Sequence, residues 1–545
     1  MELSPSAHVD TFCRDSLPPP ELWPDLEFSL PELTYAGRLN AADELLNSTI
    51  DAGGADRRCL VSPSGAWTYG QVADLAGRIA RVLTEDFGLV PGNRVLLRGP
   101  NNPWLAACWL GVLKAGCVAV PTMPMLRTAE LTSICGIARV QLALCDHRFT
   151  AELAAADAPG LRIVRFGAAE PGDLTALAAG KPAGFHSVRT AADDVAMIGF
   201  TSGTTGRPKA AMHFHRDMLA VADTFSARVL RPVPDDLFTG TPPLAFAFGI
   251  GALLLFPLRV GAASLLIERA SPAELADLIA DYGATVLSTA PTAYRAMLAA
   301  GKAAQLRGLR RAVSAGEHLP APTWTAFHQA TGVKIIDGIG STELLHIFIA
   351  AADDDIRPGS TGLPVPGYSA AVLDSDGKPV PDGEPGRLAV KGPTGCRYLS
   401  DERQRSYVQD GWNLTGDTYV RDADGYFWYQ ARSDDMIISS GYSIAGPEVE
   451  EVLLTHPDVA ECAVVGVPDE ARGQIVKAFV VLAAGAAGGE HTATELQDLV
   501  KQRIAPYKYP RAVEFVATLP RTSTGKVQRF VLRQQASDAA AGQGS

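Results

Sequence analysis

The chain lacks long hydrophobic runs, which argues against a membrane-spanning helix. Its longest apolar stretches, such as residues 253–258, are far shorter than the ~20 residues that a span requires. The first residues, MELSPSAHVDTF, contain no basic segment followed by an apolar run, so they predict no signal peptide. The eight cysteines include no CxxC pair, which disfavours structural zinc and a disulfide framework. These absences together predict a cytoplasmic protein with reduced thiols and no membrane partner.

An excess of positive charge is also missing. The net charge is −12, which argues against general binding to nucleic acid or to anionic membranes. A small polyanion would therefore need a local cluster of Lys, Arg, backbone N–H groups and Mg²⁺. No internal repeat is visible, and 545 residues at ~100–200 residues per domain predict three or four folding units. The sequence leaves the oligomeric state open, a homodimer included.

Helical and strand patterns alternate along most of the chain, which predicts parallel βαβ units. Helices are expected at 71–86, 103–114, 129–139, 272–282 and 322–331, and apolar strands at 94–99, 117–121, 141–145, 285–289 and 333–338.

Turn signals crowd together beyond about residue 360, as in DSDGKPVPDGEPG and RDADGYFWY, and they predict a small antiparallel β-barrel-like unit. We therefore expect an α/β and α+β multidomain fold. Residues 1–433 would form a large N-terminal domain of βαβ subdomains closed by this β unit. Residues 434–545 would form a small α+β domain, with a disordered tail over 536–545.

The string TSGTTGRPKA, residues 201–210, follows an apolar run and predicts an anion-binding loop. Glycines let backbone N–H groups converge on an anion, and Lys209 adds a mobile point charge suited to phosphate. The string does not fit the GxxxxGK[ST] loop of P-loop NTPases, because Pro208 and Ala210 stand at positions where that motif needs Gly and Ser or Thr. A simple polar turn remains the alternative reading of this string alone.

Four further strings follow in order: SAGEHLP (314–320), DGIGSTELLHIF (337–348), NLTGDTYVRDADGYFWYQARSDD (413–435) and PRTSTGK (520–526). With the loop at 201–210, they resemble the adenylate-forming superfamily of acyl-CoA synthetases, adenylation domains and luciferases. The resemblance implies an ATP-dependent acid–thiol ligase. Such an enzyme activates a carboxylic acid as an acyl-adenylate, releases pyrophosphate, and passes the acyl group to coenzyme A.

The resemblance also implies roles for residues. Glu343 would bind Mg²⁺, with the Thr342 hydroxyl near the α-phosphate, and Lys526 would bridge the attacking carboxylate and the α-phosphate. Asp434 would be the hinge of a mobile C-terminal domain, and Ser440, Gly441 and Tyr442 would line the coenzyme A tunnel. The implied ATP- and AMP-binding residues are Thr201, Ser202, Gly203, Thr204, Thr205, Lys209, Gly316, Glu317, Asp337, Gly338, Ile339, Asp417 and Arg432.

Each of these strings also has a structural interpretation when it is taken alone. Ser341, Thr342 and Glu343 are typical caps of a helix N-terminus. Asp417 could be a hairpin charge, and a single lysine such as Lys526 is usually a solvated surface residue. Ile339 stands where many relatives have an aromatic residue, so aliphatic contact would replace stacking on adenine.

The acid pocket is expected around PPLAFAFGIGALL, residues 242–254. FAFG combined with IGSTELLHIF resembles benzoate–CoA and 2-aminobenzoate (anthranilate)–CoA ligases, which favours an aryl–CoA ligase for anthranilate. A benzoate–CoA ligase, an adenylation enzyme that loads a carrier protein, and a non-catalytic nucleotide-binding protein remain alternatives. His213 and His215 are expected to be structural. The residues expected to bind the acid are Phe246, Ala247, Phe248, Gly340 and His346.

Overall fold

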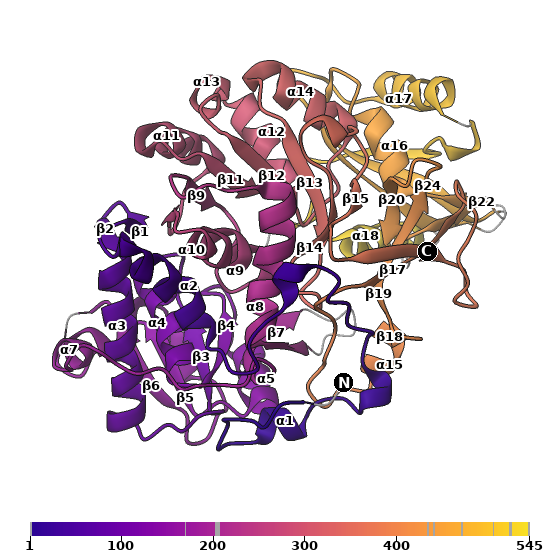
Figure 1. Ribbon diagram of the computed structural model, residues 1–545. Helices are drawn as coiled ribbons and strands as arrows, with labels where there is room; N and C mark the ends of the chain where they lie inside the picture. The colour runs from indigo at the N-terminus through magenta and orange to yellow at the C-terminus, as the bar shows by residue number, and fades with distance from the viewer. Residues whose placement is uncertain are drawn as a thin grey trace.

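The computed structural model describes residues 3–168, 170–201, 208–432, 435–439, 442–469, 472–504, 506–522 and 526–542. The chain forms a large N-terminal part and a smaller C-terminal part whose yellow elements gather on one side of the molecule in Figure 1. Within the described residues, no helix is long and apolar enough to cross a membrane. All eight cysteines are free.

The first sheet has the strand order β6-β5-β3-β4-β7-β8 and is parallel except for the pair β7–β8. Its strands are β3 (Arg94–Arg98), β4 (Val118–Thr122), β5 (Leu142–Asp146), β6 (Arg162–Phe166), β7 (Val195–Thr201) and β8 (Lys209–Phe214). Its main helices are α3 (Tyr69–Arg81), α4 (Pro103–Lys114), α5 (Thr128–Ala138) and α8 (His215–Val221). The predicted βαβ units of this region are confirmed.

The second sheet has nine strands, and its central run from β1 through β10, β9, β11 and β12 to β13 is parallel. Its strands are β1 (Arg58–Ser62), β2 (Gly65–Thr68), β9 (Leu237–Gly240), β10 (Ala263–Leu265), β11 (Val286–Thr289), β12 (Arg311–Ala315), β13 (Ile335–Gly340), β14 (Ile347–Ala350) and β15 (Leu363–Pro364). Its helices include α9 (Ala247–Ile250), α10 (Phe256–Arg259), α11 (Pro272–Tyr282), α12 (Pro291–Ala299) and α14 (Ala321–Thr331). The helix predicted over 71–86 is observed two residues longer at its start, as α3 (Tyr69–Arg81) followed by a π-helical segment, Val82–Asp86.

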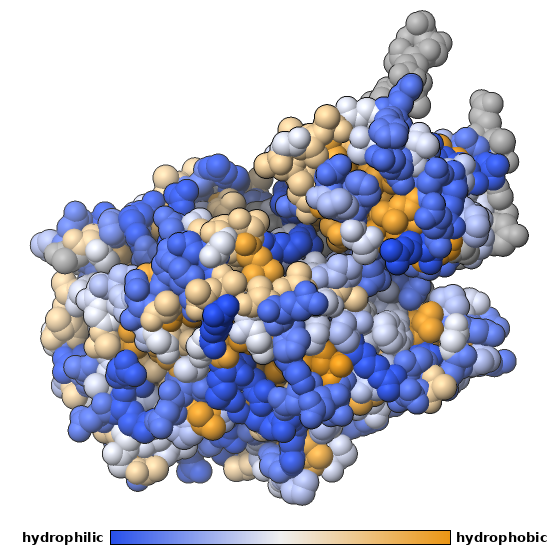
Figure 2. Space-filling model, turned by 90° about the horizontal axis from the view of Figure 1, so that it is seen from above, coloured by the Kyte–Doolittle hydropathy of each residue, from blue (hydrophilic) through white to orange (hydrophobic). Residues whose placement is uncertain are grey.

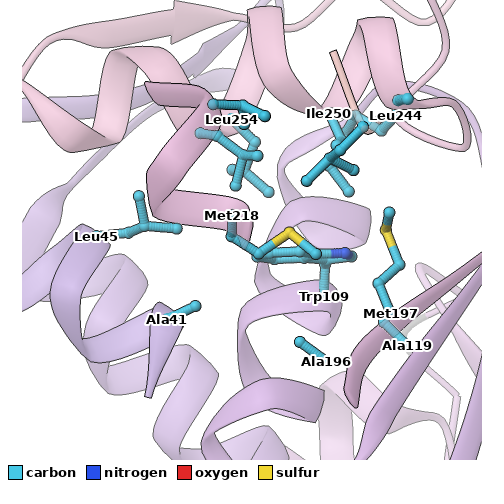
Figure 3. Packing of buried hydrophobic residues seen from close by; sticks show 14 of the residues in the cluster. Ala41, Leu45, Trp109, Ala119, Ala196, Met197, Met218, Leu244, Ile250 and Leu254 are labelled. Atoms are coloured by element: carbon cyan, nitrogen blue, oxygen red, sulfur yellow. The ribbon is translucent and has the colours of Figure 1, made fainter. Parts of the chain in front are cut away.

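One continuous hydrophobic core joins these two sheets. Figure 3 shows Trp109 of α4 at its centre, with Met218 of α8 beside the indole and with Ile250 and Leu254 pointing toward it. This packing holds the segment that begins at α9 against the first sheet, so the expected acid-binding segment has a rigid support. The surface differs from this interior, because hydrophilic residues cover much of the face in Figure 2 and hydrophobic ones form small separate groups.

A five-stranded antiparallel sheet follows, as the turn signals predict, with strands β16 (Ser369–Leu373), β17 (Pro385–Lys391), β18 (Val408–Gln409), β19 (Trp412–Arg421) and β20 (Phe427–Arg432). The C-terminal part has its own sheet and helices, namely β21 (Ile437–Ser439), β22 (Tyr442–Ile444), β23 (Val459–Asp469), β24 (Gly473–Leu482), β25 (Ala512–Phe515), α16 (Gly446–Leu453), α17 (Glu490–Arg503) and α18 (Arg529–Gly542). The expected multidomain α/β and α+β fold is confirmed.

The expectation of a disordered tail over 536–545 is wrong for residues 536–542, which belong to α18. The segment is rich in alanine, and alanine has the highest intrinsic helix propensity. The proposed division at residue 434 remains a prediction, because residues 433 and 434 lie outside the described part of the chain.

Candidate active site

A β-hairpin positions Thr342 and Glu343. Strands β13 and β14 are antiparallel, and the residues between them form a tight turn rather than a helix, so the alternative of a helix N-terminus is wrong. Leu345 has a φ of 71° although it is not glycine, a strained backbone conformation of the kind that clusters at functional sites. Glu343 is 7% exposed and accepts a hydrogen bond from the Tyr398 hydroxyl at 2.5 Å.

Lys209 lies at the loop end of the hairpin formed by β7 and β8, directly opposite Thr201. Its ammonium is 5.3 Å from the centre of the Tyr398 ring. Lys209 and Glu343 therefore both contact Tyr398, one at the ring and one at the hydroxyl. The expected phosphate-binding residues Ser202, Gly203, Thr204 and Thr205 lie outside the described residues.

Asp417 and Arg432 face each other across β19 and β20. The guanidinium of Arg432 is 3.0 Å from Oδ1 of Asp417 and also donates to the carbonyl of Thr415 at 3.2 Å. Burial raises the pKa of Asp417, and Arg432 opposes this rise. Asp417 is only 7% exposed, so it is not a solvated hairpin charge.

The C-terminal part brings Lys526 to the same place. Cε of Lys526 is 3.8 Å from the position that a Cβ on Gly316 would occupy. The residue keeps an exposed surface, and charged groups of the large part lie near enough to act on its ammonium. The loss of hydration lowers the pKa of Lys526, and the carboxylates of Asp417, Glu317 and Glu343 act in the opposite direction. The interpretation of Lys526 as an isolated surface lysine does not fit this surrounding.

Glu317 also contacts the C-terminal part. One of its carboxylate oxygens is 3.6 Å from the guanidinium of Arg521. Burial raises the pKa of Glu317, with Arg521 opposing it most. Gly316, with a φ of +90°, allows the turn that precedes this residue.

Asp337, Gly338 and Ile339 lie on β13 beside this turn, because β13 pairs with β12. Burial raises the pKa of Asp337 to about 8. A Cβ on Gly338 would lie 2.7 Å from the side chain of Ile347, so only glycine fits there. Ile339 is partly buried against the large core, with aliphatic rather than aromatic contact to offer.

Aromatic rings surround His346 in the expected acid pocket. Its ring centre lies 5.8 Å from Phe248, 5.4 Å from Phe225 and 4.5 Å from Phe256. His346 is 2% exposed, and neither of its ring nitrogens has a hydrogen-bond partner among the described residues. Burial lowers the pKa of His346 to about 3, so the imidazole is neutral at physiological pH.

Glycines make room for this histidine. A Cβ on Gly251 would lie 2.2 Å from the His346 ring, and a Cβ on Gly340 would lie 2.7 Å from its backbone. Ala247 is buried, whereas Phe246 precedes α9 and is only partly buried.

The sequence pattern did not identify three residues that contact the expected site residues. Phe225, Phe256 and Tyr398 come from distant segments and belong to no local string of the expected site. The repeated glycines of GIGALL were the one usable signal, and they correspond to the close approach at Gly251.

Of the three residues expected to line the coenzyme A tunnel, only Tyr442 is among the described residues. Tyr442 lies in β22 opposite Ser439, and its side chain is not described. Ser440, Gly441 and the expected hinge Asp434 lie outside the described residues. His213 and His215 are fully buried on β8 and at the start of α8.

Comparison with known proteins supplies the family. The model of the AMP-binding enzyme family matches residues 49–398, and the model of the AMP-binding enzyme C-terminal domain matches residues 448–526. The chain belongs to the AMP-binding enzyme family. Family and relatives together make it an AMP-forming acid–thiol ligase, as expected from the motifs.

Relatives of this ligase act on aromatic acids. It is 35% identical to a benzoate–CoA ligase of Thauera aromatica, over 92% of this chain and 97% of the relative. It is 32% identical to a 3-hydroxybenzoate–CoA ligase of Aromatoleum sp. (strain CIB), over 91% of this chain and 97% of the relative. The crystal structure of the anthranilate CoA ligase AuaEII in complex with anthranoyl-AMP matches with a TM-score of 0.89 and 35% identity, covering 94% of this chain and 100% of that one. The chain thus falls among the aryl-acid CoA ligases.

Proposed function

We propose that this ligase activates anthranilate or a closely related benzoate with ATP and transfers the aryl group to coenzyme A. One observation carries the proposal: Lys209, Glu343, Asp417 and Lys526 lie near one another, and the strand that follows Glu343 begins next to His346 in its cluster of aromatic rings. The attack of a carboxylate on the α-phosphorus needs positioning and positive charge more than covalent help from the protein. This arrangement supplies both.

The nucleotide would bind along the edge formed by β12, β13 and β19. Thr201 to Thr205 and Lys209 would hold the leaving phosphates, Gly316, Glu317 and Asp337 to Ile339 would enclose the adenine, and Asp417 with Arg432 would hold the ribose. Thr342 would contact the α-phosphate, and Lys526 would stabilise charge between the acid and that phosphate. Ser440, Gly441 and Tyr442 would line the path of the coenzyme A thiol after rotation at Asp434.

Glu343 is suited to a magnesium ion. Mg²⁺ is usually held by one or two protein carboxylates together with phosphates and water, rather than by a cage of side chains. The described residues contain no group of three or more metal-binding side chains, and Glu343 is a single carboxylate whose Oε1 accepts from the Tyr398 hydroxyl. When bound, the ion would bridge phosphate oxygens and neutralise their charge.

His346 supports the choice of an acid with an ortho amino group. A neutral imidazole has one N–H donor and one acceptor nitrogen, and both nitrogens are buried without partners. Because these nitrogens are already buried in the free protein, a substrate that supplies a partner gains a hydrogen bond worth about 0.5–1.5 kcal/mol. An amino group next to the carboxylate can pair with the acceptor nitrogen, whereas benzoate cannot.

A panel of acids tests this proposal. Anthranilate, salicylate, benzoate and short fatty acids would be compared by coenzyme A-dependent AMP release. We expect anthranilate to have the highest kcat/KM, and His346→Leu to reduce its advantage over benzoate about 10-fold, which corresponds to ~1.4 kcal/mol. A preference for fatty acids, or an unchanged ratio in the variant, would contradict the proposal. Carrier proteins offered in place of coenzyme A would reveal the alternative acceptor.

A further inference from the structure

Tyr398 makes a buried contact that the proposed reaction does not yet use. Its side chain is fully buried, and its hydroxyl donates to Oε1 of Glu343 at 2.5 Å. Burial raises the pKa of Tyr398 well above its usual value, and the charge of Glu343 raises it further. The phenol therefore stays protonated and acts as a hydrogen-bond donor to the carboxylate at any pH at which the enzyme works.

The backbone around Tyr398 is fixed to the strand that leaves the phosphate loop. The N–H of Met212 donates to the carbonyl of Arg397 at 2.8 Å, and the N–H of Leu399 donates to the carbonyl of Ala210 at 2.9 Å. These bonds attach the segment on both sides of Tyr398 to β8. The position of the phenol is therefore coupled to the strand that carries Lys209.

Side chains hold the same segment from behind. Arg397 is fully buried, donates to Asp217 at 2.7 Å, and lies 4.0 Å above the ring of Phe214. The Tyr398 ring meets the ring of Tyr407 edge-on at 5.7 Å. A tyrosine that only filled the core would not need its hydroxyl directed at a carboxylate of the site.

Tyr398 thus contacts two groups of opposite charge that the proposed function assigns to one ligand. The ammonium of Lys209 lies 5.3 Å from its ring centre, within the range of a cation–π interaction. The carboxylate of Glu343 accepts from its hydroxyl. Ring and hydroxyl together restrict both groups before any nucleotide binds.

We propose that Tyr398 is a positioning residue for the magnesium–triphosphate: its hydroxyl fixes Oε1 of Glu343 and so orients the carboxylate that would hold the ion, while its ring restricts Lys209, which would bind the phosphates. This inference rests on the proposed role of Glu343. Residues that orient a metal-binding side chain typically change metal affinity 10- to 100-fold when they are replaced. Loss of the hydroxyl would also leave a buried carboxylate oxygen without its donor.

Tyr398→Phe tests the hydroxyl, and Tyr69→Phe is the matched control. Tyr69 lies in the same large part, is likewise fully buried, and donates its hydroxyl to the carbonyl of Ala262 at 2.7 Å. Two quantities would be measured: the Mg²⁺ concentration that gives half-maximal acid-dependent pyrophosphate exchange, and the affinity for Mn²⁺ in the presence of ATP, by electron paramagnetic resonance. Thermal unfolding without ligands reports any general loss of stability.

We expect Tyr398→Phe to raise the half-maximal Mg²⁺ concentration and to weaken Mn²⁺ binding, each by about 10-fold or more, and Tyr69→Phe to change neither. Transfer from supplied aryl-adenylate to coenzyme A should stay within about 2-fold, because that step involves no triphosphate. If Tyr398→Phe does not fold, Tyr398→Met gives the same test, since it also removes the hydroxyl and introduces no donor beside Oε1.

Glu343→Gln tests the proposed metal site separately from the role of Tyr398. If Glu343→Gln weakens Mn²⁺ binding and the Tyr398 variants behave like Tyr69→Phe, the role of Tyr398 is refuted and the proposed metal site stands. If Glu343→Gln itself leaves Mn²⁺ binding unchanged, the proposed metal site is refuted.

Discussion

Ion pairs inside the large N-terminal part differ in burial from those that join it to the C-terminal part. In the large N-terminal part, Arg397 and Asp217 form an ion pair at 2.7 Å with both side chains fully buried. Between the two parts, Arg521 and Glu317 lie 3.6 Å apart, with 25% and 18% of their side chains exposed. A buried pair is costly to break, whereas a partly exposed pair contributes little. The difference fits the proposed function, in which a fixed nucleotide site would be served by a lysine on a mobile domain.

Removing one partner of the buried pair should give the largest effect. We expect Arg397→Met to lower the free energy of unfolding by about 3–5 kcal/mol, because Asp217 would stay buried without its counter-charge. Urea unfolding followed by circular dichroism measures the change. Arg521→Gln is the comparison and should cost less than ~1 kcal/mol. Equal losses of unfolding free energy in the two variants would show that the buried pair and the pair between the parts contribute alike.

Lys526→Ala should separate the two half-reactions. We expect acid-dependent pyrophosphate exchange to fall about 100- to 1000-fold, the usual effect of losing one group that stabilises developing charge. Transfer from supplied aryl-adenylate to coenzyme A should change by less than ~5-fold, because that step occurs after the pyrophosphate has left. Stopped-flow measurement of each half-reaction gives both numbers. A similar loss in both would mean that Lys526 serves the fold or both steps.

Asp337 should give the large part a pH dependence of stability. Its pKa rises from 3.8 to about 8 on folding because of burial, so the folded state retains a proton that the unfolded state has released. Stability due to this group is therefore greatest at low pH, falls as the pH rises between these two values, and levels off above about 8.

Asp337→Asn should remove that dependence. Between pH 5 and pH 8, we expect the unfolding free energy of the original protein to fall by about 2–4 kcal/mol more than that of the variant, at ~1.4 kcal/mol per pH unit. Urea midpoints at the two pH values provide the measurement. Parallel pH profiles would show that Asp337 ionises freely in the folded protein.

The sequence predicted the fold well where local patterns decide it. The alternation of helix and strand in residues 71–145 and 272–338 reflects periodicity within each element, and parallel strand pairs in both sheets follow from it. Lys209, Glu343 and Asp417 could be named because each belongs to a short string of its own. The resemblance then supplied roles that spacing alone could not.

Contacts between residues far apart in the sequence could not be predicted from local patterns. Tyr398 meets Glu343 from 55 positions away, and no periodicity relates the two. The turn at Glu343 looked like a helix start, because capping residues and turn residues are of the same types. The tail was judged by its small polar residues, while its alanines favoured the helix α18.

Glu451 makes a contact between the two parts, and its replacement should have the smallest effect of the variants considered. Helix α14 of the large part has no side-chain cap of its own at Pro320, and the N–H of Ala321 donates to the Glu451 carboxylate of the C-terminal part at 3.1 Å. Burial raises the pKa of Glu451. A carboxylate is favourable at a helix N-terminus, so this contact stabilises the arrangement that brings Lys526 to the site.

We expect Glu451→Ala to slow pyrophosphate exchange about 5-fold, since loss of a helix cap typically costs ~1 kcal/mol. Aryl transfer from supplied adenylate should not slow, because the contact would matter only while Lys526 is in place. Glu448→Ala is the matched control on the same helix, since Glu448 pairs with Lys508 at 2.6 Å inside the C-terminal part. Glu451→Gln, which keeps an acceptor oxygen, should retain most of the exchange rate. Equal effects of Glu448→Ala and Glu451→Ala would show that α16 acts only through the stability of its own domain.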